Sequence, residues 1–172
     1  MGAYVNFDLT QYKDFFQRVG NAAQGDFRKE LETYLEGLGN EFLRVLQDEI
    51  IRREVIDTRL LLNSFHKGGA ENIWEMDVGG LTLEVGTNVS YAKYVNDGHW
   101  TVGKGKSSRW VPGHWAGDRF IYSPGATTGM LLKQKWVAGR HFWESGLRII
   151  EAIYPKLVEA KLQAWINSYF GL

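Results

Sequence analysis

The stretch that decides the fold covers residues 81–100 and reads LTLEVGTNVSYAKYVNDGHW. Its first residues alternate between apolar and polar, so that Leu81, Leu83 and Val85 share one face. A period of two is typical of a strand with one buried face. Gly86 is expected to end this strand, because glycine tolerates backbone angles that branched residues do not.

A short aromatic helix is predicted to follow the strand. Thr87 and Asn88 can each cap it through a side-chain oxygen. The residues that then recur at helical spacing are Tyr91, Ala92, Tyr94 and Val95. Gly98 can close the last turn, since glycine is common after helix C-termini. We expect Tyr91 and Tyr94 to anchor this helix against the sheet.

Long helices are predicted on both sides of this stretch. Residues 26–53 carry an apolar stripe at steps of three and four, made of Phe27, Leu31, Leu35, Leu38, Phe42, Val45, Leu46 and Ile50. The charged residues between them, Glu49 included, are expected to form a solvated face. Gly37 and Gly39 are costly inside a helix and indicate a kink or the close approach of another backbone.

A second long helix is predicted to follow the GRHFWE stretch at residues 139–144 and to reach about residue 170. Pro155 lies inside its apolar pattern and is expected to kink or split it. A further short helix is predicted over residues 8–20, with Asp8 as its cap.

Residues 73–78 and 81–85 are predicted to pair as a hairpin around Gly79 and Gly80, a dipeptide that suits a two-residue loop. Residues 120–122 and 131–137 are expected to add strands to the same sheet. These elements predict an α+β fold, in which a small, mainly antiparallel sheet is packed by the long N-terminal and C-terminal helices. The length of 172 residues, 44% of them hydrophobic, favours a single domain over residues 1–172.

The composition changes between residues 99 and 140. This segment holds seven basic residues and one acidic residue, a formal charge of +6, which leaves −6 on the rest of the chain. Its GKGKSS stretch at residues 103–108 is predicted to be mobile. We therefore expect an extended hairpin or loop arm, inserted at about residues 99–136. Its candidate contacts with partners or subunits are Lys104, Lys106, Arg109, Trp110, Trp115 and Arg119.

Enzymatic and metal-dependent functions find little support in the sequence. There is no cysteine, and the four histidines lack the short paired spacing of zinc ligands. The GKGKSS stretch does not fit a phosphate-binding loop, and no G-x-S-x-G nucleophile motif is present. We predict no catalytic residue, no metal and no cofactor. A small hydrolase using Asp97 with His99, or Asp118 with His114, stays open as a third reading.

Charge and hydropathy narrow the partners. The 20 basic and 20 acidic residues balance, whereas a dedicated nucleic-acid clamp usually carries a basic excess. No apolar run is long enough to span a membrane, and the N-terminus is too polar for a signal peptide. We expect synthesis in the cytoplasm and no membrane partner.

Three motifs, in order, resemble those of phage tail-completion and head–tail joining proteins. The first, V-D-T-G-x-L-R-x-S, is matched by Ile56, Asp57, Thr58, Leu61 and Ser64. The second, V-G-T-N-x-x-Y-A-x-Y-V-x-x-G, is matched by Gly86, Thr87, Asn88, Tyr91, Ala92, Tyr94, Val95 and Gly98. The third, R-x-F-x-x-x-A-L, is matched by Arg140, Phe142 and Leu147. The chain departs from the motifs at Arg59 (usually Gly), Leu62 (usually Arg) and Gly146 (usually Ala).

The resemblance implies a structural virion protein of a tailed phage or prophage, placed in the tail or neck. It would complete the tail end and join tail to head, as a ring whose channel passes genome DNA without sequence-specific contact. Its partners would be other tail and head-connector proteins. The isolated chain is expected to be monomeric, because its helices show no sustained heptad seam. The alternative is a nucleic-acid-binding protein that uses the basic Arg/Trp-rich loop.

Overall fold

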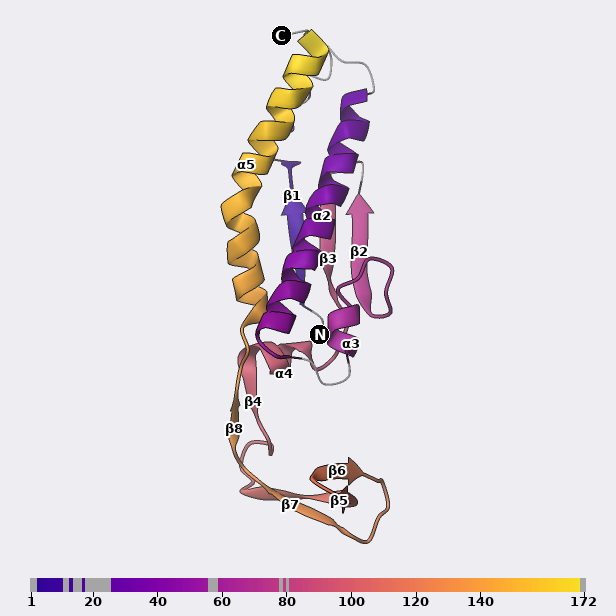
Figure 1. Cartoon of the computed structure of the whole chain (residues 1–172), viewed down its shortest axis with the longest axis vertical. Helices are drawn as coiled ribbons and strands as arrows, with labels where there is room; N and C mark the ends of the chain where they lie inside the picture. The colour runs from indigo at the N-terminus through magenta and orange to yellow at the C-terminus, as the bar shows by residue number, and fades with distance from the viewer. Residues whose placement is uncertain are drawn as a thin grey trace. The chain divides into compact units, whose positions relative to one another are not determined.

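The computed structural model describes residues 3–10, 13, 17, 26–55, 59–77, 79 and 81–170. Their helices and strands (Figure 1) are β1 (Ala3–Asp8), α2 (Asp26–Arg52), α3 (Leu60–Asn63), β2 (Asn72–Asp77), β3 (Thr82–Thr87), α4 (Ala92–Asp97), β4 (Gly98–Trp100), β5 (Ser108–Ala116), β6 (Arg119–Tyr122), β7 (Gly129–Lys133), β8 (Trp136–Ala138) and α5 (Phe142–Phe170). The chain divides into two compact units. The first unit comprises Met1–Asn96 and His141–Leu172, and the second unit comprises Asp97–Arg140. The predicted α+β class is confirmed, because the long helices α2 and α5 are in contact and the strands form small antiparallel sheets.

The sheet of the first unit has three antiparallel strands in the order β1-β3-β2. In its register, Val85 lies opposite Val5 on β1 and Trp74 on β2. Leu83 and Val85 are fully buried on one face of the sheet, which confirms the alternation predicted for them. Leu81 precedes the strand and has a positive φ of 55°.

The connection between β2 and β3 is longer than predicted. Asp77 pairs with Thr82, so four residues link the strands instead of Gly79 and Gly80 alone. The predicted two-residue loop is therefore wrong.

Gly86 does not end β3, because the strand continues through Thr87. A Cβ atom at position 86 would lie 2.6 Å from the Cα atom of Tyr4 on β1. The glycine is thus explained by the close approach of β1, and no positive φ is needed there.

Helix α2 contacts β3 of the sheet, and α5 packs beside α2 (Figure 1). The described members of its predicted apolar stripe are all buried: Leu31, Leu35, Leu38, Phe42, Val45, Leu46 and Ile50. The side chain of Phe27 lies outside the described residues. At Gly39, a Cβ atom would lie 2.5 Å from Leu83 Cδ2 and 2.8 Å from Trp74 Cη2. This glycine therefore marks a close approach, although side chains of the sheet approach it and not a backbone.

Helix α5 runs as one continuous helix with Pro155 inside it, so the predicted split is wrong. Near its start, a Cβ atom at Gly146 would lie 2.6 Å from Leu46 Cδ2 on α2. The departure from the usual alanine thus lets the two helices approach. Phe142, also at the start of α5, packs edge-on against Phe65 with 6.1 Å between ring centroids.

The helix predicted over residues 8–20 lies largely outside the described residues. Asp8, its expected cap, is instead the last residue of β1. Its carboxylate accepts a hydrogen bond from the backbone N–H of Thr10 at 2.7 Å.

The strands of the second unit form sheets of their own. β4 pairs with β8, and β5 lies between β6 and β7. The prediction that residues 120–122 and 131–137 extend the first sheet is therefore wrong. β5 changes partner along its length, since Pro112 pairs with Gly129 on β7 and Gly113 pairs with Tyr122 on β6.

Candidate interaction site

The first two motifs meet at a buried chain of hydrogen bonds. The hydroxyl of Thr87 donates to Ser64 Oγ at 2.7 Å and accepts the backbone N–H of Val89 at 3.1 Å. Ser64 Oγ donates in turn to the carbonyl of Leu61 at 2.8 Å. Thr87 and Ser64 are fully buried. The chain of bonds satisfies hydroxyl groups that would otherwise be costly in the core, and it ties α3 to the end of β3.

The residue before α3 has a backbone conformation that favours glycine. Arg59 precedes the helix with φ 61° and ψ −3°, in the left-handed region. The motif usually has Gly here, and glycine adopts this conformation without steric cost. Arg59 therefore keeps the turn at some cost in strain. Asp57 and Thr58 lie outside the described residues, whereas Leu61 is buried.

The tyrosine motif presents one side of α4 to the core. Ala92 is buried, and Tyr91 and Val95 pack against the core cluster. Tyr94 is 59% exposed, so the prediction that it anchors the helix is wrong. Its position lies on the other side of the helix from Ala92, because successive residues are turned by about 100°.

The two residues expected to cap this helix lie too far before it to do so, because α4 begins at Ala92. Thr87 Oγ1 accepts the backbone N–H of Val89 in the connection between β3 and α4, whereas Asn88 is exposed and its backbone N–H donates to the carbonyl of Glu71 at 2.8 Å. Gly98 follows the helix with a φ of 87°, as predicted for a residue that closes the last turn.

Asn96, a residue not predicted to matter, connects the second motif to the third. Its Oδ1 accepts the backbone N–H of Trp143 at 3.0 Å, and its Nδ2 donates to Glu144 Oε1 at 2.8 Å. Its backbone carbonyl accepts the N–H of His141 at 2.9 Å. Only 6% of Asn96 is exposed. The signal in the sequence is a polar residue on the core-facing side of a short helix.

The third motif begins α5. Phe142 is 1% exposed, and Leu147 packs half-buried against the same core cluster. Arg140 is exposed. Most motif residues therefore build the first unit from inside.

Glu49 is the buried charge of the first unit. It is 5% exposed, which corrects its predicted place on the solvated face of α2. Arg52 Nε donates to its Oε1 at 2.8 Å, and Arg53 Nε donates to its Oε2 at 3.0 Å. Hydrogen bonds from Arg52 first, then from Ser145 on α5 and from Arg53, lower the pKa of Glu49 from 4.5 to about 2, although burial opposes this. The carboxylate thus helps to fix the C-terminus of α2 to the start of α5.

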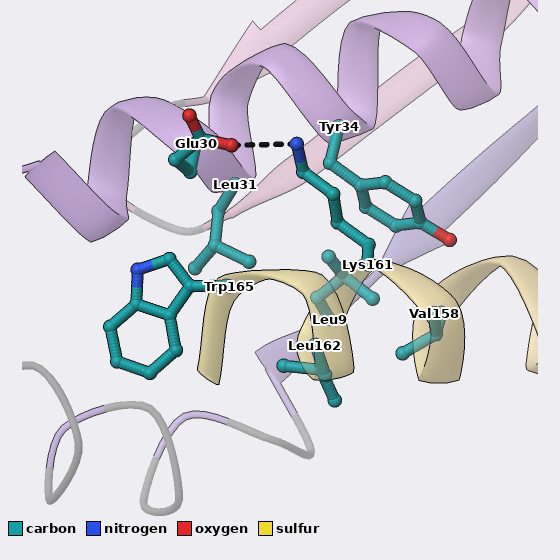
Figure 2. A pocket seen from close by; sticks show the side chains of 8 residues that line it. All are labelled: Leu9, Glu30, Leu31, Tyr34, Val158, Lys161, Leu162 and Trp165. Atoms are coloured by element: carbon teal, nitrogen blue, oxygen red, sulfur yellow. Dashed lines mark ion pairs between the residues drawn. The ribbon is translucent and has the colours of Figure 1, made fainter. Parts of the chain in front are cut away.

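A small apolar pocket lies between α2 and α5 (Figure 2). Its lining residues are Leu9, Glu30, Leu31, Tyr34, Val158, Lys161, Leu162 and Trp165. At its rim, Lys161 Nζ and Glu30 Oε2 form an ion pair at 2.6 Å. The enclosed space of about 20 Å³ is close to the size of one water molecule. We therefore interpret it as a packing gap and not as a ligand site.

The predicted contact residues of the second unit are all exposed: Lys104, Lys106, Arg109, Trp110, Trp115 and Arg119. The structure does not gather them in one cluster. Trp110 lies opposite Leu131 of β7, whereas Trp115 lies opposite Phe120 of β6 and packs edge-on against it at 5.3 Å. Lys104 and Lys106 lie in the connection between β4 and β5.

In the part of the chain that the structure describes, no three His, Asp or Glu side chains come together as metal ligands. None of the described helices is long and apolar enough to cross a membrane.

Known proteins resemble this chain in sequence. Residues 13–98 match the family described as "Bacteriophage HK97-gp10, putative tail-component". This match ends beside the start of the second unit at Asp97. No solved structure matches the chain.

Two proteins of Bacillus subtilis (strain 168) are similar over most of their length. "Uncharacterized protein YqbI" is 48% identical over 159 residues, which cover 91% of this chain and 95% of that protein. "Phage-like element PBSX protein XkdI" is 46% identical over 147 residues, which cover 86% of this chain and 90% of that protein. The shares left uncovered are too small to hold the second unit, so both similarities extend into it. Together with the motifs and their shared core, these matches show that the chain belongs to the HK97-gp10-like family of phage tail components.

Proposed function

We propose that this chain is a tail-completion protein, which closes the end of a phage or prophage tail and joins it to the head connector as a ring of identical subunits. The observation that supports this most is the surface of the second unit, where the tryptophans and the basic side chains are exposed. Aromatic residues and arginine are enriched at protein interfaces. A tail component with such a surface is suited to docking.

The two units have different roles. Motif residues such as Ser64, Thr87 and Phe142 are buried in the first unit and hold it together. Contacts with neighbours therefore fall mainly to residues outside the motifs. We propose that the second unit is an arm inserted into a tail-completion domain for this purpose.

Such a protein acts by assembly and not by chemistry. In a cyclic ring, one patch of each subunit contacts a different patch of the next, and closure leaves a central channel. The genome passes this channel without sequence-specific contact. Neighbouring tail proteins and the head connector are the partners, and the isolated chain is a monomer before it meets them.

The second unit can be removed at a defined point. The backbone N–H of Thr101 donates to the carbonyl of Lys135 at 3.0 Å, so these residues lie side by side. We therefore replace residues 102–134 by a short Gly-Ser turn and express this variant in a prophage that lacks the native copy. The first unit should keep its melting temperature, while electron microscopy should show separate heads and tails.

The matched control replaces two exposed lysines of the first unit, Lys29 and Lys156, by alanine, and it should support normal joining. Joined particles in normal numbers from the shortened chain would refute the proposal. A salt-sensitive gel shift with DNA, given by the native chain and lost in the shortened one, would favour nucleic-acid binding instead.

A further inference from the structure

The second unit has almost no core of its own. Within Asp97–Arg140, which the structure describes throughout, Val102 is the only buried apolar side chain. Large apolar side chains at least 40% exposed are Trp100, Trp110, Trp115, Ile121, Tyr122, Leu131, Trp136 and Val137. Sheets of two or three strands without a buried face are marginally stable in water. An apolar surface of this kind marks an interaction site.

Two of these rings lie closely against glycines on the paired strand. A Cβ atom at Gly98 would lie 2.7 Å from the Trp136 ring, and one at Gly129 would lie 2.7 Å from the Trp110 ring. Trp100 and Trp136 also pack edge-on at 5.3 Å. Rings fixed before binding lose little conformational entropy when a partner covers them.

Charge narrows the choice of partner. The second unit holds seven basic and two acidic residues, a formal charge of +5, and the first unit holds thirteen basic and eighteen acidic residues, a formal charge of −5. The two units of this protein are therefore complementary in sign. A partner for the second unit should present carboxylates beside apolar groups.

The first unit presents such a surface on its sheet. One face of the sheet is buried, as Leu83 and Val85 show. The alternating residues form the opposite face, here called the outer sheet face: Tyr4, Asn6 and Asp8 on β1, Thr82, Glu84 and Gly86 on β3, and Ile73, Glu75 and Asp77 on β2. Four of these nine residues are acidic and none is basic. Tyr4 is 59% exposed beside Gly86 and supplies an apolar edge.

The outer sheet face also carries a local repulsion. Glu75 and Glu84 lie directly opposite each other on neighbouring strands. Like charges in this arrangement destabilise a sheet. A cationic partner laid on this face would remove the repulsion.

We propose that the second unit of one copy docks on the outer sheet face of the next copy. In this contact Arg109 and Arg119 pair with the carboxylates of the sheet, and tryptophan rings cover Tyr4. The two patches differ, so the contact runs head to tail and can close a ring. This inference rests on the proposed function and specifies how its subunits are joined.

A second copy of this chain explains the charges of both units, whereas an unrelated acidic protein explains only that of the second unit. Each copy brings one unit with a formal charge of +5 and one with a formal charge of −5, and the chain as a whole has a formal charge of zero. In head-to-tail contacts, the second unit and the outer sheet face of every subunit each meet a surface of opposite charge. An unrelated acidic partner would cover the second unit and leave the outer sheet face bare.

The absence of cysteine allows a clean cross-linking test. We introduce Asn6→Cys on the outer sheet face and Ala116→Cys on β5, both at exposed positions, and treat purified tails with a short bismaleimide. The double variant should give a ladder of dimers, trimers and larger species. Each single variant should give dimers at most. The matched control pairs Ala116→Cys with Asp48→Cys on the exposed side of α2, and it should give no ladder.

Charge reversal tests the same contact independently. Glu75→Lys with Glu84→Lys should reduce the ladder about tenfold, as should Arg109→Glu with Arg119→Glu, because attraction becomes repulsion at two pairs. Combining all four reversals should restore it. Tails that carry the cysteine pair, join normally and yield no ladder would overturn the inference and leave the proposed function standing. If the intact chain with the cysteine pair gives a ladder, but particles of the chain shortened by residues 102–134 still join normally, the result would count against the proposed function alone.

Discussion

Two glycines of α2 allow the packing of this helix to be tested with one type of substitution. At Gly39 an added Cβ atom would lie 2.5 Å from Leu83 Cδ2, and Leu83 is fully buried. At Gly37, two residues earlier, an added Cβ atom has no neighbour within 4 Å. Replacing either by alanine changes the helix propensity equally, so any difference between them reports the contact with the sheet.

The expected magnitudes have opposite signs. Alanine is better than glycine in a helix by about 1 kcal/mol, so Gly37→Ala should raise the free energy of unfolding by about that amount. Gly39→Ala makes the same gain but also forces atoms into a packed core, which costs about 1–3 kcal/mol. We expect it to lower the free energy of unfolding by about 1 kcal/mol. The two variants should therefore differ by about 2 kcal/mol.

Urea unfolding followed by tryptophan fluorescence gives both values, and calorimetry gives a second estimate. For a chain of this size the difference should appear as about 4–8 °C in the melting temperature. If Gly39→Ala stabilised the protein as much as Gly37→Ala, the close approach of α2 to Leu83 and Trp74 would be wrong.

Further predictions concern the motifs and the buried carboxylate. Arg59→Gly should raise the free energy of unfolding by about 1 kcal/mol, because glycine adopts the left-handed conformation without strain. A lower free energy of unfolding, measured with urea, would contradict this. Thr87→Val should lower it by about 1–3 kcal/mol, since the buried N–H of Val89 loses its acceptor; an unchanged urea midpoint would show that the bond is dispensable. Tyr94→Ala should change the melting temperature little, because the ring is exposed; a large drop would place the ring in the core. The pKa of Glu49 is lower in the folded state, so its contribution is complete above pH 4.5 and is lost as the pH falls toward 2. We expect the free energy of unfolding to fall by about 2 kcal/mol over this pH range, after allowance for solvent screening. Glu49→Gln should reduce this dependence on pH, and an equal dependence in both proteins would refute the prediction.

The elements that the sequence predicts well are those with long or strict periods. The stripe recurs along α2, a helix of 27 residues, so neighbouring residues reinforce one another, and the structure buries it as expected. The pairing of strands is different, because a period of two identifies a strand but not its partner. Residues 131–137 thus became β7 and β8 in separate sheets.

Strand β5 was not predicted, because it contains residues that usually interrupt strands. Pro112 and Gly113 interrupt residues 108–116, and a proline argues against a strand between two others. The structure accommodates both, because β5 changes from β7 to β6 at this point. A residue that breaks one ladder can therefore mark the place where a strand exchanges partners.

The candidate site was only partly within reach of the sequence. The motifs identified Ser64 and Thr87, but not that they touch, because residues 23 positions apart meet only through the fold. Asn96 was missed for the same reason, since its role depends on where α5 begins. Glu49 was misplaced because its side chain reaches inward from a helix with many charged residues.

Burial distinguishes the residues that build the family's fold from the residues that contact partners. Residues that a family shares for its fold are drawn inward, so a motif such as that of Thr87 reports packing and not contact. The family match ends at residue 98, and the second unit begins at Asp97. A surface that chooses partners must be exposed, and in this chain it combines basic charge with rings held against glycines. Differences in partner choice among related tail components should therefore be sought between residues 97 and 140, while changes in the motifs should alter stability first.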